Sequence, residues 1–212
     1  MRQISDNNNV FQLVIIYSFV GPDGESGIRG NSLRPADDER SHMKRRVLIS
    51  HERILERVRD LGLKISEDYR GKEPLLIGIL NGVVFFFADL VMALSVPLRM
   101  DFIKTSSYGS EMTSSGQIKM IKDVGLPVKN QDLIVVEDIV DTGLTLKSIL
   151  ENLKTREPSS IKVCALIDKR ERREQQVKID YCGFEVEKGF LVGYGLDFDE
   201  KFRYLPDICV IE

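Results

Sequence analysis

Residues 132–150, DLIVVEDIVDTGLTLKSIL, constrain the fold more than any other part of the sequence. A continuous apolar run leads into two adjacent acids, Glu137 and Asp138, as expected of a buried strand that ends in polar residues. A short loop with Asp141 and Gly143 follows, and then an amphipathic helix. Strand, loop and helix in this order predict an α/β fold with parallel strands.

The alternation of strands and helices continues on both sides of this stretch. Continuous apolar runs predict strands, and apolar residues at helical spacing predict helices. The expected strands cover residues 74–80, 98–103, 132–137 and 161–167, with further strand material at 184–186 and 190–192. The expected helices cover 50–69, 83–94 and 144–155, and Ser50 can cap the first. The pattern predicts a mostly parallel sheet with helices on both sides.

The chain divides into two parts of different character. Its 212 residues, 42% of them apolar, suit one α/β domain with a sizeable core. Residues 1–42 are polar and rich in Gly and Asp around one apolar run, Val10–Val20. That run lacks the basic flank and cleavage site of a signal peptide. We interpret 1–42 as a poorly ordered extension or a wrongly assigned start, and 43–212 as the folded domain.

Charge and cysteine content exclude several classes of function. The formal net charge is −3, whereas bulk nucleic-acid binding usually needs a strongly basic face. The three cysteines show no CxxC spacing, which argues against a disulfide framework or a zinc site and fits a reducing cytoplasm. No apolar run has the roughly 18–20 residues of a membrane span. We therefore expect a cytoplasmic protein without nucleic-acid or membrane partners.

The loop between the central strand and its helix has the chemistry of an anion site. A helix N-terminus presents free N–H groups and a positive dipole, which suit a phosphate. Gly143 allows close approach of the backbone, and Thr142 and Thr145 add hydroxyl donors. The loop lacks the Gly-Lys-Ser/Thr ending of a P-loop. Glu137 and Asp138 are suitable acceptors for sugar hydroxyls or ligands for Mg²⁺. Solvated acids before a capped helix are the simpler alternative.

These residues carry a family resemblance. VVEDIVDTGLTL (135–146) resembles the phosphoribosyl pyrophosphate (PRPP) motif of type I phosphoribosyltransferases. Four further segments resemble the hypoxanthine-guanine branch: LNGVVFFFADL (80–90), DFIKTSSYGS (101–110), LIDKR (166–170) and GFLVGYGLDFDEKFRYLP (189–206). The resemblance extends over about residues 47–212.

The resemblance implies a fold and a reaction. The fold would be the type I phosphoribosyltransferase fold, with a mostly parallel central sheet flanked by helices, a small hood and a mobile active-site loop. The reaction would be Mg²⁺-dependent transfer of phosphoribose from PRPP to N9 of hypoxanthine or guanine. It would yield IMP or GMP plus pyrophosphate, as in purine salvage. A homodimer or homotetramer would be expected.

On the sugar side, the resemblance implies that Glu137 and Asp138 contact the ribose hydroxyls or their metal ion. The 5′-phosphate would be cradled by Asp141, Thr142, Gly143, Leu144 and Thr145. Asp141 would also act as general acid/base at N7 of the purine. A carboxylate there can stabilise the oxocarbenium-like charge and take the N7 proton as N9 attacks. Its alternative role is a plain helix N-cap.

On the base side, the resemblance makes Lys169 the donor to the 6-oxo group of the purine. A fixed cation there selects a 6-oxopurine over adenine, because an amino group would leave the donor unpaired. Without the resemblance, the run KRERRE (169–174) is typical of a solvated charged turn. Phe190 would stack on the base and the Leu191 backbone would read its N1/N2 edge. A core aromatic is the alternative for Phe190.

The pyrophosphate side would involve several separate segments. Asn81 and Gly82 match the pyrophosphate-binding loop, whose peptide can be cis in the family. Many members have Lys at position 81, so Asn81 is a departure. Asp197 would bind Mg²⁺ and Arg203 would contact pyrophosphate, although an acidic surface turn is the default for this segment.

The polar segment 104–125, rich in Ser, Thr and Gly, is long for a connector. It resembles the mobile loop that closes over the site, with Ser107 and Tyr108 as its characteristic pair near pyrophosphate. Closure would exclude water from the reaction. A disordered surface loop is the alternative.

Two other functions remain open. A nucleotide-sensing regulator of the same fold would need a basic face, which the charge balance does not favour. A phosphoribosyltransferase for xanthine or another base is the second alternative. Lys169 favours a 6-oxopurine, but the sequence does not rank hypoxanthine, guanine and xanthine.

Overall fold

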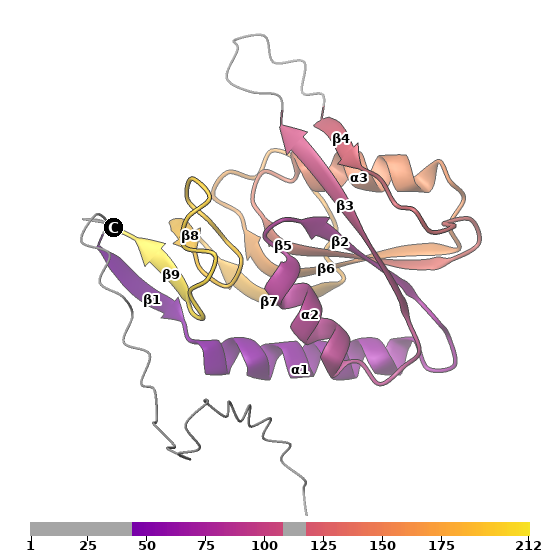
Figure 1. Cartoon of the computed structure of the whole chain (residues 1–212), viewed down its shortest axis with the longest axis horizontal. Coiled ribbons are helices and arrows are strands. Elements are labelled where there is room, and N and C mark those ends of the chain that lie inside the picture. The colour runs from indigo at the N-terminus through magenta and orange to yellow at the C-terminus, as the bar shows by residue number, and fades with distance from the viewer. Residues whose placement is uncertain (1–43, 108–117) are drawn as a thin grey trace, which may run out of the picture. The chain divides into compact units, whose positions relative to one another are not determined.

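The computed structural model describes residues 44–107 and 118–212, which contain nine strands and three helices (Figure 1). The strands are β1 (Arg45–Ile49), β2 (Leu75–Leu80), β3 (Arg99–Ser107), β4 (Ile118–Lys122), β5 (Asp132–Val140), β6 (Ser160–Lys169), β7 (Tyr181–Val186), β8 (Phe190–Val192) and β9 (Ile208–Ile211). The helices are α1 (His51–Asp68), α2 (Val84–Ala93) and α3 (Leu144–Lys154).

A six-stranded sheet forms the centre of this part of the chain. Its strand order is β4-β3-β2-β5-β6-β7. β2 is parallel to both β3 and β5, and the parallel pairing continues through β6 to β7, whereas β4 is antiparallel to β3. The expected mostly parallel sheet is confirmed. The carboxyl ends of β2, β5 and β6 therefore lie side by side, where α/β sheets usually bind ligands.

Helices cover both faces of this sheet, as the alternation of its side chains requires. Leu76 and Ile134 point to the face covered by α1 and α2. Their neighbours Ile77 and Val135 point to the other face, where α3 packs. All four side chains are fully buried, because a strand covered on both faces buries every residue.

A second, three-stranded antiparallel sheet has the order β1-β9-β8 and corresponds to the expected hood. The sequence patterns did not predict β1 or β9, which are short and pair only with distant segments. The turn after β8 depends on Gly193, whose φ is +97°. A Cβ there would lie 2.0 Å from the Asp207 carbonyl oxygen.

Several predicted boundaries were too short. β5 continues to Val140, so Glu137 and Asp138 lie within the strand rather than beyond it. The segment expected as a loop, 104–125, begins in β3 and includes β4, which pairs with the end of β3. Ser50 occupies the N-cap position of α1, but its side chain makes no capping hydrogen bond.

None of the helices in the described ranges has the length and apolar character that a membrane crossing requires. Cys164, Cys182 and Cys209 are all free.

Candidate active site

A polar cavity of about 300 Å³ opens at the carboxyl edge of the six-stranded sheet. It gathers ten of the predicted site residues: Asn81, Gly82, Glu137, Asp138, Asp141, Thr142, Gly143, Thr145, Asp197 and Arg203. Predicted Leu144 does not line the cavity. Its backbone N–H donates to the Thr142 hydroxyl at 3.3 Å. Segments far apart in the sequence thus meet where the topology of the sheet places them.

The loop that joins β5 to α3 presents a helix N-terminus to this cavity. Gly143 is the N-cap residue, with φ +81°, and no side chain caps the helix. Apart from the Leu144 N–H, which donates to the Thr142 hydroxyl at 3.3 Å, the start of α3 has no side-chain cap, which suits an anion. A Cβ at Gly143 would lie 2.5 Å from the Gln175 carbonyl oxygen, so glycine is required here. The alternative role of Asp141 as the helix N-cap is wrong. We call residues 141–145 the phosphate loop.

Glu137 and Asp138 are buried acids at the floor of the cavity. The Asp138 N–H lies 3.2 Å from Glu137 Oε1, and the Ile139 N–H donates to Asp138 Oδ1 at 2.8 Å. Burial raises the pKa of both carboxyls, and the adjacent Asp138 raises the pKa of Glu137 further. Two buried acids with raised pKa values are suited to bind the hydroxyl groups of a ligand or a metal ion.

The loop after β2 contacts both the acids and the hood. Its Leu80–Asn81 peptide is cis. A Cβ at Gly82 would lie 1.7 Å from Asp138 Oδ2, and a Cβ at Gly195 would lie 1.9 Å from the Gly82 carbonyl oxygen. The exposed Asn81 side chain lines the cavity beside them. Glycine at positions 82 and 195 therefore allows three separate segments to meet.

A second cavity, of about 280 Å³, adjoins the first. Its lining includes the three residues predicted to bind a base: Lys169, Phe190 and Leu191. Both cavities are lined by Asp138, Ile139, Asp141 and Asp197. Asp141 therefore stands where the contents of the two cavities would meet.

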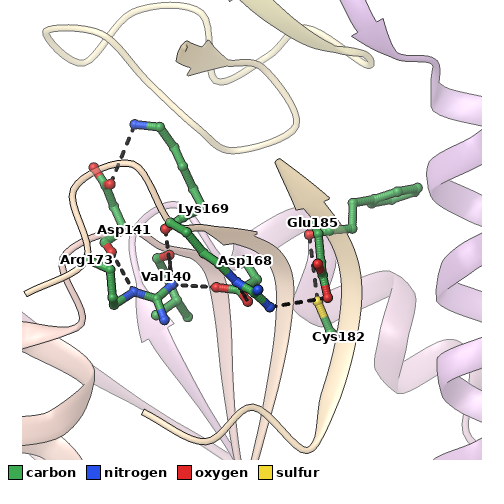
Figure 2. Close-up of polar contacts among 9 residues, drawn as sticks. Val140, Asp141, Asp168, Lys169, Arg173, Cys182 and Glu185 are labelled. Carbon is green, nitrogen blue, oxygen red and sulfur yellow. Dashed lines mark hydrogen bonds and ion pairs between the residues drawn. The ribbon is translucent and has the colours of Figure 1, made fainter. Parts of the chain in front are cut away.

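The environment of Lys169 differs from that of a solvated turn. Its side chain is only 7% exposed, and Nζ lies 3.5 Å from Asp141 Oδ1 and 3.4 Å from Glu171 Oε2 (Figure 2). Asp141 Oδ1 is itself buried and has no hydrogen-bond partner. The expectation of a mostly solvated run at 169–174 is wrong at Lys169 and also at Arg173, whose side chain is 9% exposed. The reason is that β6 extends to Lys169 and the following turn folds against the phosphate loop.

The first two residues of β8, Phe190 and Leu191, occupy different environments. Leu191 is buried, whereas Phe190 is 45% exposed and lines the second cavity. Phe190 meets Phe198 edge to face, with ring centroids 5.1 Å apart. The core-aromatic alternative for Phe190 is therefore wrong, because its ring stays available to a flat ligand.

Asp197 and Arg203 pair with each other across the rim of the first cavity. Arg203 Nη2 lies 2.8 Å from Asp197 Oδ1 and 2.9 Å from Glu200 Oε2, and Nη1 donates to the Gly195 carbonyl at 2.7 Å. The turn that contains Asp197 is therefore held by these bonds, and Asp197 lines the cavity. The default reading of a surface acidic turn does not describe it.

The protein could supply carboxylate ligands to a metal ion in this cavity, but not a complete coordination shell. Within residues 44–107 and 118–212, no three His, Cys, Asp or Glu side chains group as a metal site. Mg²⁺ usually takes one or two carboxylates and completes its shell with water and substrate phosphates. The carboxylates that line the cavity, Glu137, Asp138 and Asp197, fit that manner of binding.

Some residues of the site had no signal in the sequence. Thr105 and Ile139 line the first cavity, and Arg172, whose Nε lies 3.4 Å from Asp141 Oδ2, lines the second. Thr105 and Ile139 lie within the matched segments 101–110 and 135–146, and Arg172 lies just beyond 166–170, which was the only clue to them. Ser107 ends β3, and predicted Tyr108 lies outside the described residues.

Comparisons with known proteins agree with this geometry. The family model described as phosphoribosyl transferase domain matches residues 48–199. The hypoxanthine-guanine phosphoribosyltransferase of Bacillus subtilis is 43% identical over 171 residues, 81% of this chain and 95% of that protein. A crystal structure of a hypoxanthine-guanine phosphoribosyltransferase from Bacillus anthracis has a TM-score of 0.75 and 39% identity, covering 80% of this chain and 99% of that one. The hypoxanthine phosphoribosyl transferase of Trypanosoma cruzi has a TM-score of 0.76 and 38% identity, covering 81% and 93%.

Proposed function

Since the chain belongs to the phosphoribosyl transferase family, as one of its hypoxanthine-guanine phosphoribosyltransferases, we propose that the two adjoining cavities bind the two substrates of that reaction. The enzyme transfers phosphoribose from PRPP to N9 of hypoxanthine or guanine and releases pyrophosphate, which is a step of purine salvage. The position of Asp141 on the walls of both cavities carries the proposal.

The first cavity would bind PRPP. The uncapped start of α3 and the hydroxyls of Thr142 and Thr145 are suited to the 5′-phosphate. Glu137 and Asp138 line this cavity and would accept hydrogen bonds from the ribose hydroxyls. Arg203, with Asn81 and Gly82, would contact the pyrophosphate group and exchange its present partner Asp197 for the ligand.

The second cavity would bind the base. Lys169, buried beside Asp141, would donate to the 6-oxo group, and the exposed ring of Phe190 would stack on the purine. The Leu191 backbone would meet the N1/N2 edge. The Lys169 ammonium can only donate, so it cannot accept a hydrogen bond from the 6-amino group of adenine. Binding of adenine would therefore leave the Lys169 donor unpaired.

Asp141 would move the proton. Its Oδ1 is buried without a hydrogen-bond partner, which leaves the atom available to N7 of a bound purine. As N9 attacks the anomeric carbon and pyrophosphate leaves, the carboxylate would stabilise the positive charge on the sugar and take the N7 proton. The neighbouring Lys169 would keep the base oriented for that transfer.

We also propose that the reaction depends on Mg²⁺, held by Asp197, Glu137 and Asp138 together with oxygens of PRPP. Such an ion would neutralise charge on the leaving pyrophosphate. Calorimetric titration of PRPP with and without Mg²⁺ tests this dependence; equal affinity in both conditions would contradict it.

A homodimer or homotetramer in the cytoplasm is the assembly that we propose. Exposed apolar side chains on α2 and β3 support association: Val84, Phe85, Met92 and Met100. Light scattering across a dilution series would detect it. The free thiols agree with a reducing compartment.

The decisive assay follows pyrophosphate release from PRPP and Mg²⁺ with hypoxanthine, guanine, xanthine or adenine as acceptor. We expect turnover with hypoxanthine or guanine. No turnover with any oxopurine would contradict the function, and adenine as the best substrate would contradict the role of Lys169.

A further inference from the structure

We propose that Arg173 is a positioning residue that couples the phosphate loop to Lys169, so that binding at one cavity strengthens binding at the other. The proposal rests on the function above, which places the 5′-phosphate at the loop and the base at Lys169. Nothing in the reaction itself requires Arg173, which lines neither of the two cavities.

Arg173 joins the ends of the two strands that carry the site (Figure 2). Its Nε donates to the Asp141 carbonyl at 2.8 Å, and its Nη2 donates to the Val140 carbonyl at 2.7 Å. The same Nη2 lies 3.1 Å from the Lys169 carbonyl and also bonds the Asp168 carboxylate. One guanidinium thus holds the backbone of the proposed proton acceptor and of the proposed base-binding lysine.

The residues that follow Arg173 strengthen this connection. The N–H groups of Glu174 and Gln175 both donate to the Thr142 carbonyl at 2.9 Å. Lys147 of α3 donates from Nζ to the Gln175 side-chain oxygen at 2.7 Å. The turn after β6 is therefore bonded to the phosphate loop at several points, and the two cannot move independently.

The chemistry of arginine suits this position. The side chains of Arg173 and Asp168 are each 9% exposed, so the buried charges compensate each other. A planar guanidinium reaches several carbonyl oxygens at once, whereas a lysine ammonium is a point charge on a flexible stem. Removal of the guanidinium would leave the carbonyls of Val140 and Asp141 without this donor.

Coupling follows if either ligand orders the shared backbone. A phosphate at residues 141–145 would fix the carbonyls that Arg173 binds, and through it the end of β6 with Lys169. The base would then meet a positioned lysine. Linkage makes the effect reciprocal, and such couplings usually amount to about 5- to 150-fold in affinity.

The test measures this coupling directly. Hypoxanthine is titrated calorimetrically in the absence and in the presence of saturating ribose 5-phosphate, which supplies the 5′-phosphate but cannot react. The ratio of the two dissociation constants is the coupling factor. We expect about tenfold tighter binding with ribose 5-phosphate in the wild-type protein, and a ratio near one for Arg173→Met. Arg173→Lys should give an intermediate ratio.

Arg170→Met is the matched control. Arg170 Nε also bonds Asp168, at 3.1 Å, but its side chain is 65% exposed and its other ion pair is with Glu185, at 3.3 Å. We expect this variant to keep the wild-type ratio. A merely structural role for Arg173 would lower the melting temperature of its variants and leave the ratio of the folded protein unchanged.

The outcomes separate the proposal from the function on which it rests. If the wild type binds neither ligand, the function itself is wrong. If the wild type turns over hypoxanthine but shows a ratio of one, or if Arg173→Lys and Arg173→Met both keep the wild-type ratio, the coupling role is wrong. Should Arg173→Met fail to fold, the Arg173→Lys ratio decides.

Discussion

The two edges of the six-stranded sheet carry charged clusters of opposite kinds. At the amino edge, the Tyr181 hydroxyl donates to Asp68 Oδ2 at 2.6 Å, and Lys162 Nζ donates to the same oxygen at 3.0 Å and to the tyrosine oxygen at 2.9 Å. Each member has a partner. At the carboxyl edge, Asp141 Oδ1 is buried without a hydrogen-bond partner and Glu137 is buried beside another acid.

The difference appears in the titration of the two clusters. Hydrogen bonds from Tyr181 and Lys162 lower the pKa of Asp68, so its charged form is favoured in the folded protein. Burial raises the pKa of Glu137, so its charged form is disfavoured. At the amino edge, the cluster of Asp68, Lys162 and Tyr181 is complete without a ligand. The other edge keeps polar groups incompletely satisfied, at some expense of stability, until ligands complete them.

Asp141→Asn should produce the largest effect. We expect kcat to fall by about 10²- to 10⁴-fold, because an amide cannot take the N7 proton. Folding and PRPP binding should survive, since the buried Lys169 keeps Glu171 as a second charged partner at 3.4 Å. Stopped-assay rates and thermal melts measure the two effects, and an unchanged rate would remove Asp141 from the chemistry.

Lys169→Met should act on the base alone. We expect KM for hypoxanthine to rise about 10- to 100-fold, because a hydrogen bond from a charged donor contributes about 1.5–3 kcal/mol. KM for PRPP should stay within about twofold, and discrimination against adenine should weaken. Initial rates with each substrate varied in turn provide the measurement; an equal rise of both KM values would indicate general damage to the site.

Tyr181→Phe tests the amino edge. The variant loses the hydrogen bond to Asp68 but keeps the ring, which is 2% exposed. We expect a loss of about 1–2 kcal/mol in the free energy of unfolding, measured by urea denaturation. The kinetic constants should not change. A fall in kcat without a loss of stability would contradict the assignment of the Tyr181 cluster to stability and of the carboxyl edge to catalysis.

Glu137→Gln should give the smallest effect, and one that depends on pH. A raised pKa in the folded state means that this acid favours folding below its ordinary value of 4.5 and that the contribution is lost as pH rises. The ligand-free variant should therefore gain in melting temperature over the wild type as the pH rises above the ordinary value of 4.5. Asp68→Asn should behave in the opposite way, because its lowered pKa gives stability that is lost as pH falls. Melts of Glu137→Gln above pH 4.5 and of Asp68→Asn below pH 3.8, each beside the wild type, measure the two trends; the same sign of pH dependence in both variants would contradict the comparison.

Much of the fold could be predicted because it is recorded in local patterns. The continuous apolar runs of β2, β5 and β6 and the spacing of α1 and α3 identify the central sheet and its covering helices. The strands of the hood could not be found in this way. β1 and β9 are short, and each is stabilised by a partner far away in the sequence.

The site shows the same limit. The acids and the phosphate loop lie in one continuous motif, so their proximity follows from the strand, loop and helix. The burial of Lys169 and Arg173 follows instead from backbone contacts between the turn after β6 and the phosphate loop. Charged residues in a run look solvated when only composition is considered, and no local pattern marks which of them turns inward.

The pairing of β8 with β9 has a consequence for how the enzyme is made. The acids of β5 and the phosphate loop leave the ribosome long before Ile208–Ile211, whereas β8, which carries Phe190 and Leu191, has β9 as its strand partner within the described residues. A nascent chain that stops short of β9 would therefore hold the phosphate loop without a finished wall for the purine. Truncated products of translation should then retain part of the PRPP cavity and yet be unable to consume PRPP, which spares the cell a wasteful fragment.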